Sequence, residues 1–152
     1  DILVDDYQEQ ADCENLASML VVSHDYFIFE HSLKLLVGNL LKREEKLLDK
    51  RYKKYKEWNM KQISKFFNER KINLEAIEGF QDYNVLRLLV NDIKHNGARV
   101  SRELAEAKRE ILEDGEFREI KEIRVSRDEV NKYSDAVRLV YDDLIGRLDK
   151  NF

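Results

Sequence analysis

The chain has 152 residues, of which 38% are charged and 43% are hydrophobic, with a formal net charge of −4. This balance is typical of a folded globular protein and excludes a disordered tail. No apolar run approaches the roughly 20 residues of a membrane-spanning helix, and the first residues lack the pattern of a signal peptide. Because the sequence has no proline, we predict a mainly α fold, a single bundle of four to five helices over residues 1–152.

A first long helix is predicted to start within residues 5–15 and to run to about residue 50. At about 100° per residue its middle has two apolar faces. One face carries His24, Phe27, Ile28, His31 and Leu35, and the opposite one carries Phe29, Leu33, Leu36 and Leu40. Such a helix must be buried on both sides, at the centre of a bundle or between subunits. We expect a homodimer, and a central position within one chain is the alternative.

Charge is distributed unevenly along this part of the chain. No Lys or Arg precedes Lys34, although several acids do, whereas the segment KLLDKRYKKYK, residues 46–56, holds six basic residues and one acid. The predicted RNA-binding residues of this segment are Lys50, Arg51, Lys53 and Lys54, with Tyr52 and Tyr55 among them. Cations hold a phosphate backbone and aromatic rings stack on bases. The alternative is a solvated helix end that balances the acidic segment.

Further helices follow in the rest of the chain. We predict one from Glu57 to about Arg70, one from about Gln81 to Asn96 that Gly97 stops, and a fourth, RELAEAKREIL, that Ser101 caps. Ser126 and Glu129 form a capping-box pattern for the last helix. Its apolar residues repeat at near-heptad spacing: Val130, Tyr133, Val137, Val140, Leu144 and Leu148. A short β segment near residues 117–125 is an open alternative.

The helix over residues 81–96 carries a polar stripe. Arg87, Asn91 and His95 lie at i, i+4 and i+8, and Lys94 lies at the edge beside Val90. A polar line between apolar borders is expected in a groove, against another helix or at a subunit interface. His transfers protons near neutral pH, Arg or Lys binds phosphate, and Asn orients either one. These four polar residues are candidate catalytic residues for phosphodiester cleavage, in which RNA supplies its own nucleophile, the 2′-hydroxyl.

VNDIKHN, within the segment LRLLVNDIKHNGARVSRELAE at residues 86–106, resembles the motif region of the HEPN superfamily (higher eukaryotes and prokaryotes nucleotide-binding). The motif of that family is an Arg, commonly followed by a polar residue such as Asn, and then a His. Asn91 and His95 match, whereas Val90 stands at the usual place of the arginine and Arg87 lies one turn earlier. The resemblance implies an often dimeric helical bundle and a metal-independent endoribonuclease of a bacterial toxin or phage-defence system. RNA and an antitoxin or other protein would then be its partners.

Other interpretations of these residues remain open. Asn and His near a helix C-terminus often cap carbonyl groups, and Arg87 pairs equally well with an acid of a neighbouring helix. The chain would then be a non-catalytic helical module for oligomerisation, RNA binding or partner binding. No metal or cofactor is expected, because neither His24 nor His31 follows a Glu at i−3 and no HExxH occurs. The single cysteine, Cys13, suggests a cytoplasmic protein.

Overall fold

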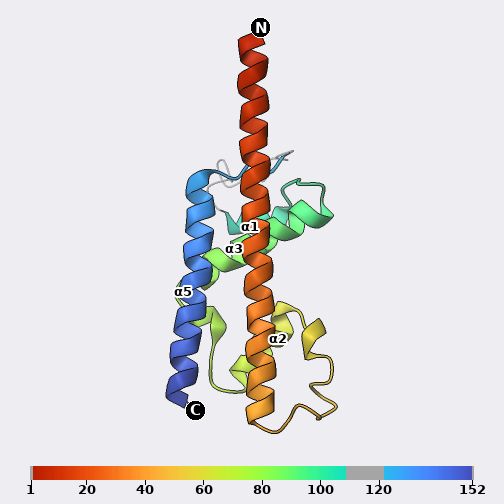
Figure 1. Ribbon diagram of the computed structural model, residues 1–152, viewed down its shortest axis with the longest axis vertical. Coiled ribbons are helices and arrows are strands. Elements are labelled where there is room, and N and C mark those ends of the chain that lie inside the picture. Colours follow the sequence, from red (N-terminus) through yellow and green to blue (C-terminus); the bar gives the residue numbers. More distant parts are fainter. Residues whose placement is uncertain (1, 109–121, 152) are drawn as a thin grey trace.

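The computed structural model describes residues 2–108 and 122–151, and every regular element in these ranges is helical (Figure 1). Its five α-helices are α1 (Ile2–Arg43), α2 (Met60–Asn68), α3 (Phe80–His95), α4 (Arg102–Ala107) and α5 (Arg127–Asn151). Short 3-10 turns, η1 and η2, cover Tyr55–Glu57 and Leu74–Ala76. The predicted mainly α bundle of four to five helices is confirmed. Among the described residues, no helix combines the length and the apolar character that crossing a bilayer requires.

The core of the bundle lies where α1, α3 and α5 meet. α1 and α5 lie side by side and run in the same direction, and α3 crosses them (Figure 1). The inward face of α1 is one of the two predicted apolar faces, with Phe29, Leu33 and Leu40 buried and Leu36 half-buried. The centre of the Phe29 ring lies 4.8 Å from that of Tyr83 in α3 and 6.5 Å from that of Tyr141 in α5. Aromatic packing therefore joins the three long helices.

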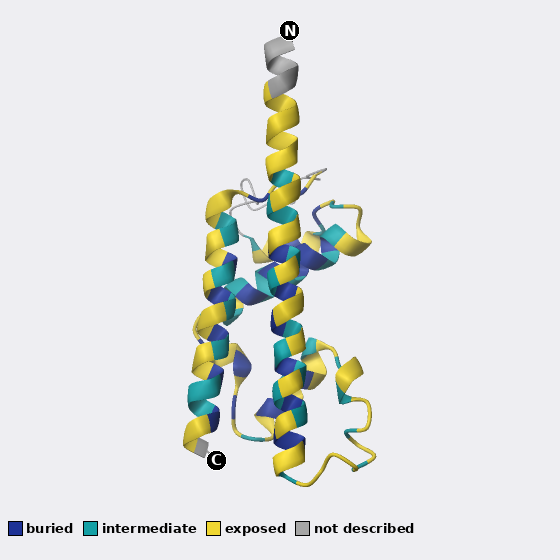
Figure 2. Ribbon diagram, in the orientation of Figure 1, coloured by how far each residue is buried: buried dark blue, intermediate teal, exposed yellow. Residues whose placement is uncertain are grey.

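The opposite face of α1 is open to solvent. Ile28 and Leu35 are 54% and 55% exposed, and His24, Phe27 and His31 are exposed as well (Figure 2). The alternative of a helix buried centrally within one chain is therefore wrong, because the described part of the chain leaves this face uncovered. Burial between subunits stays a prediction.

The ends of α1 differ from the prediction. The helix begins at Ile2, before the predicted start, and ends at Arg43, before the predicted end. Glu45 adopts a left-handed φ of 56°, and the amide of Lys46 donates to the carbonyl of Leu41 at 2.8 Å. This is a Schellman motif without glycine, which sequence rules do not anticipate. The helix predicted from Glu57 starts instead at Met60, because Asn59 and Gln62 form a capping box.

Other helix ends follow the sequence signals. Gly97 has a φ of 59° just after α3, and the Ser101 hydroxyl accepts a hydrogen bond from the amide of Leu104 at the start of α4. Ser126 and Glu129 form the predicted capping box, with distances of 3.0 and 3.2 Å from backbone nitrogen to side-chain oxygen. α4 ends at Ala107, earlier than predicted, because Lys108 leaves the helical conformation; the rest of the predicted helix, residues 109–112, lies outside the described residues.

The proposed β segment is not seen in its described part. Residues 122–125 form no strand, and residues 117–121 lie outside the described ranges. The amide of Ile123 donates to the carbonyl of Ala98 at 2.8 Å. The side chain of Asn15 donates to the Ile123 carbonyl at 3.1 Å and accepts from the Val125 amide at 2.8 Å. The Asn15 side chain thus forms hydrogen bonds to this segment that a neighbouring strand would form in a sheet.

Candidate functional site

The four predicted catalytic residues lie on α3, between its middle and its C-terminal end. Arg87 and Asn91 are half-buried, whereas Lys94 and His95 are exposed. The Arg87 guanidinium donates from Nε and Nη2 to Oδ1 of Asn84, at 3.1 and 3.0 Å. The ammonium of Lys94 lies 3.8 Å from the centre of the Phe27 ring on α1, which is cation–π geometry. The polar stripe therefore contacts α1 through Lys94 and is exposed to solvent at His95.

A matching polar stripe on α1 lies close to α3. Tyr26, Glu30 and Lys34 occupy i, i+4 and i+8, and Nζ of Lys34 lies 2.6 Å from Oε1 of Glu30. Burial alone would raise the pKa of Glu30, but hydrogen bonds from Lys34 and Tyr26, with the charge of Lys94, bring that pKa below its ordinary value. Burial, and then the hydrogen bond to Glu30, raises the pKa of Tyr26, which the charge of Arg87 only partly offsets. At neutral pH the contact therefore holds an ionised Glu30 and a protonated Tyr26.

A groove between α2 and α3 gathers further cations. It has a volume of about 840 Å³, and Lys61 and Lys65 from α2 line it together with Arg87 from α3. Glu69 and Glu75 also line it, so three cations face two acids. Of the four predicted catalytic residues, Arg87 is the one that belongs to this groove. The two lysines were not predicted, although their i, i+4 spacing in the sequence placed them on one helix face.

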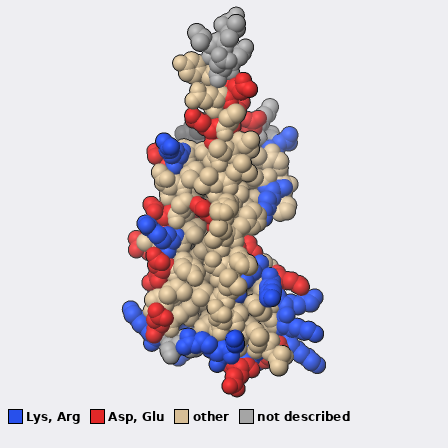
Figure 3. All heavy atoms as spheres, viewed as in Figure 1, with Lys and Arg blue, Asp and Glu red and all other residues tan. Residues whose placement is uncertain are grey.

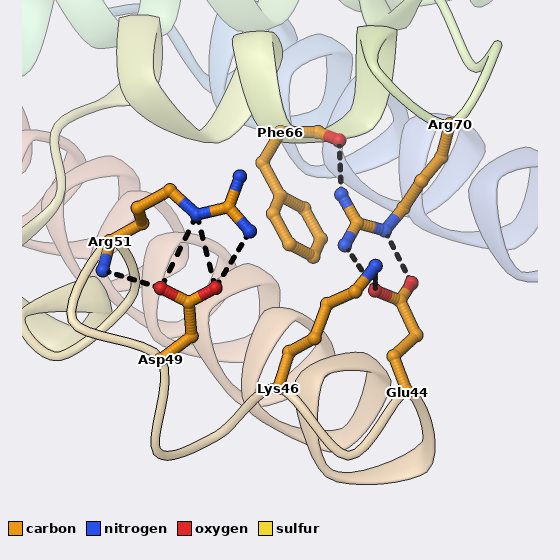
Figure 4. Close-up of polar contacts among 6 residues, drawn as sticks. All are labelled: Glu44, Lys46, Asp49, Arg51, Phe66 and Arg70. Carbon is orange, nitrogen blue, oxygen red and sulfur yellow. Dashed lines mark hydrogen bonds and ion pairs between the residues drawn. The ribbon is translucent and has the colours of Figure 1, made fainter.

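The basic segment, residues 46–56, packs against α1 and α2 through its two tyrosines. Arg51 is paired with Asp49, with Nη2 to Oδ2 at 2.7 Å (Figure 4). The Tyr52 ring packs against Phe66, with ring centres 6.1 Å apart. The Tyr55 ring covers Gly38 so closely that a Cβ there would lie 2.7 Å from the hydroxyl oxygen. Both tyrosines, which had been expected to stack on bases, are therefore used in internal packing.

The remaining predicted RNA-binding cations are open to solvent. Lys50 and Lys53 are exposed, and Nζ of Lys54 lies 3.9 Å from the carboxylate of Glu57, with both side chains largely exposed. Figure 3 shows Lys and Arg gathered at the end of the molecule away from the N-terminus. α2, which lines the groove with Lys61 and Lys65, begins four residues after this segment ends.

A nearly buried ion pair between Glu44 and Arg70 joins the chain just after α1 to the chain just after α2. Nε and Nη2 of Arg70 donate to the carboxylate of Glu44 at 2.7 and 2.6 Å, and Nη1 donates to the carbonyl of Phe66 at 2.9 Å (Figure 4). The guanidinium also stacks 3.5 Å from the centre of the Phe66 ring. The hydrogen bond from Arg70 holds the pKa of Glu44 below its ordinary value. The pair therefore stays ionised and holds the end of α1 to α2.

One buried acid supports the end of the polar stripe. Asp92 is only 7% exposed, and its Oδ2 accepts a hydrogen bond from the backbone amide of Ser101 at 2.7 Å. This bond ties the start of α4 to α3, next to His95. Sequence reasoning missed Asp92; the signal was an acid on an otherwise apolar helix face.

The two histidines of α1 are not gathered with other metal ligands. Both are exposed, and the described residues hold no group of three or more His, Cys, Asp or Glu side chains that could bind a metal ion. His24 lies 3.8 Å from the carboxylate of its neighbour Asp25.

No family model, curated protein or solved structure matches this chain. The resemblance of residues 86–106 to the HEPN superfamily motif is therefore supported by none of these comparisons and stays a prediction. Helical bundles carry many unrelated functions, so the function has to be argued from the residues of the site.

Proposed function

We propose that this chain binds single-stranded RNA along α2 and α3 and cleaves it without a metal, as a HEPN-like endoribonuclease of bacterial toxin or phage-defence type. The observation that carries the proposal is the groove that Lys61, Lys65 and Arg87 line, because Arg87 lies on the same helix, α3, as the exposed His95. Such grooves hold the phosphate backbone of a single strand. The single cysteine fits a cytoplasmic setting, and an antitoxin or another protein is the expected partner.

The chemistry follows from the α3 stripe. The ribose 2′-oxygen forms a bond to phosphorus, and the bond from phosphorus to the 5′-oxygen breaks. His95 accepts the proton of the 2′-hydroxyl, and water gives a proton to the leaving 5′-oxygen. Lys94 stabilises the charge that develops on the phosphate, and Asn91 donates a hydrogen bond to one of its oxygens. Arg87 holds the neighbouring phosphate in the groove.

RNA binding is tested by reversing charge in the groove. Lys61→Glu combined with Lys65→Glu should weaken the binding of a fluorescein-labelled single-stranded RNA at least about tenfold in an anisotropy titration, because two phosphate contacts are lost. Lys132→Glu combined with Arg138→Glu makes the same change of net charge on exposed positions of α5. If both double variants bind equally weakly, total charge and not the groove determines binding.

Cleavage is tested separately, on RNA that the wild type binds, in the presence of EDTA. Wild type should produce fragments with 2′,3′-cyclic phosphate ends, whereas His95→Ala should produce none while keeping its circular dichroism spectrum. His31→Ala removes another exposed histidine and should cleave normally. Unchanged cleavage by His95→Ala would contradict the assignment of the base.

The second candidate is an RNA-binding or partner-binding module without catalysis. It is favoured by the two hydrogen bonds that commit Arg87 to Asn84 and by Val90 at the usual position of the family's arginine. RNA that binds in the groove and stays intact with folded wild type would support this candidate over the endoribonuclease.

A further inference from the structure

One side of the α2–α3 groove carries an aromatic ring, an amide and an acid in place of cations. Glu75, Phe80 and Asn84 line this groove, and the same three residues line a second groove, of about 980 Å³, beside α4 and α5. They therefore form a ridge between the two grooves. Aromatic rings stack on unpaired bases, and amide and carboxylate groups form hydrogen bonds with base edges. The ridge thus has the chemistry of a nucleobase-binding site.

The ridge is held in place by contacts on its buried side. The Phe80 ring is half-buried, and its centre lies 5.6 Å from that of the fully buried Tyr83. The side chain of Asn73 accepts a hydrogen bond from the backbone amide of Glu75 at 3.0 Å, and the neighbouring Leu74 is buried. A ligand would therefore meet the Phe80 ring and the Glu75 backbone in fixed positions, which lowers the entropic cost of binding.

The amide group of Asn84 is oriented to donate to a ligand. Its Oδ1 accepts from Nε and Nη2 of Arg87, and a guanidinium has no acceptor, so the atom facing Arg87 has to be the oxygen. Within residues 2–108 and 122–151 the Nδ2 atom has no acceptor, and no buried side-chain nitrogen or oxygen there lacks a partner. The Nδ2 group is therefore in contact with solvent and available to bind an oxygen of a ligand.

The carboxylate of Glu75 is an acceptor on the same ridge. Glu75 is exposed, and it forms no ion pair with any residue that the structure describes. An acid in a groove for phosphates repels the backbone of RNA, so its presence favours binding only if it contacts a part of the nucleotide that carries N–H groups. The edges of the bases carry such groups.

We infer that the ridge binds a guanine base of the RNA strand, an inference that rests on the proposed function. Phe80 stacks on the base, Asn84 donates to O6, and the Glu75 carboxylate accepts from N1–H and from the 2-amino group. Among the four bases of RNA, only guanine has two neighbouring N–H groups next to a carbonyl oxygen. Phe80, Asn84 and Arg87 lie at i, i+4 and i+7 on one face of α3, so the strand continues from the base to the phosphate at Arg87.

The binding of three RNA strands tests the site without requiring cleavage. Each is a fluorescein-labelled oligouridine, either unchanged or with one central guanosine or adenosine, and 2′-O-methylation keeps it intact. In anisotropy titrations wild type should bind the guanosine strand about tenfold tighter than the other two. Glu75→Ala should abolish this preference without weakening the binding of plain oligouridine, because it removes a negative charge from the groove. Glu69→Ala makes the same change of charge in the same groove and should keep the preference.

A second variant tests the amide of the ridge. In Asn84→Asp the carboxylate still accepts from Arg87 but has no N–H to donate to O6, so the ratio of guanosine-strand to oligouridine affinity should fall. Equal affinity of wild type for the three strands, or an unchanged ratio in Glu75→Ala or Asn84→Asp, would overturn the guanine site and leave the groove itself, which the lysine variants test. Wild type that binds none of the strands would overturn the inference together with the proposed function.

Discussion

The two sides of α1 have similar composition and opposite surroundings. Phe29 is 2% exposed and Phe27 is 45% exposed, although they are two residues apart on the same helix. Phe29 packs against Tyr83 and Tyr141, whereas the Phe27 ring has the ammonium of Lys94 on its face. Hydrophobic periodicity thus identifies an apolar face, and the tertiary fold decides whether the same chain covers it.

The largest difference between the two sides is expected from removing these rings. Phe29→Ala should lower the free energy of unfolding by about 3–5 kcal/mol, because it leaves a cavity between three helices. Phe27→Ala should cost less than about 1 kcal/mol at protein concentrations too low for self-association. Urea unfolding followed by circular dichroism measures both. Equal losses would show that the outward face is not open in solution.

The ion pair between Glu44 and Arg70, just beyond the C-terminal end of α1, should give the next largest effect. Glu44→Gln should cost about 2 kcal/mol at neutral pH, because the 10% exposed Arg70 side chain would keep its charge and lose its carboxylate. Glu57→Gln removes the acid of the exposed pair with Lys54 and should cause no measurable loss. Urea unfolding of both variants and of wild type measures the two losses of stability. Equal losses for Glu44→Gln and Glu57→Gln would show a general effect of removing a negative charge, and would contradict the role of the buried pair.

The same pair predicts a pH dependence of stability. Because the pKa of Glu44 is lower in the folded chain than its ordinary value of 4.5, the carboxylate contributes its full stabilisation above that value. The contribution should be lost as the pH falls through the folded pKa. The difference in unfolding free energy between wild type and Glu44→Gln should therefore shrink on acidification. A difference that stays constant at every pH where the chain folds would contradict the assigned ion pair.

A smaller effect is expected at Gly38, where the Tyr55 ring covers the outward side of α1. A Cβ on Gly38 would lie 3.0 Å from Cε2 of Tyr55, so Gly38→Ala should cost about 1 kcal/mol by displacing the ring. In a Tyr55→Ala background the same change should stabilise by up to about 1 kcal/mol, because Ala favours a helix over Gly. Equal changes in both backgrounds, measured by urea unfolding, would show that the ring does not rest on Gly38.

Much of the fold could be predicted because its signals are local. Gly97, Ser101 and Ser126 end or cap helices as their chemistry predicts, and apolar periodicity locates α3 and α5. The end of α1 could not be predicted, because Glu45 adopts a left-handed conformation that sequence rules assign to Gly or Asn. The residue before it, Glu44, is bound by Arg70 from a distant part of the sequence, a contact that local signals do not show.

The candidate site was predictable only in part. Helical spacing alone places Arg87, Asn91 and His95 on one side of α3, without showing what faces them. Glu30 on α1 and Lys65 on α2 come from distant positions in the sequence, and tertiary packing alone brings them near the stripe. The basic segment was expected to offer free aromatic rings, and packing against α1 and α2 uses them instead.

The salt dependence of RNA affinity tests the central claim, that the α2–α3 groove holds the phosphate backbone, most directly. The logarithm of the association constant should fall linearly with the logarithm of the salt concentration. The slope for Lys61→Ala combined with Lys65→Ala should be shallower by about 1.4, since each phosphate contact to a single strand contributes about 0.7. An identical slope for wild type and the double variant would contradict the account, because the groove lysines would then contact no phosphate.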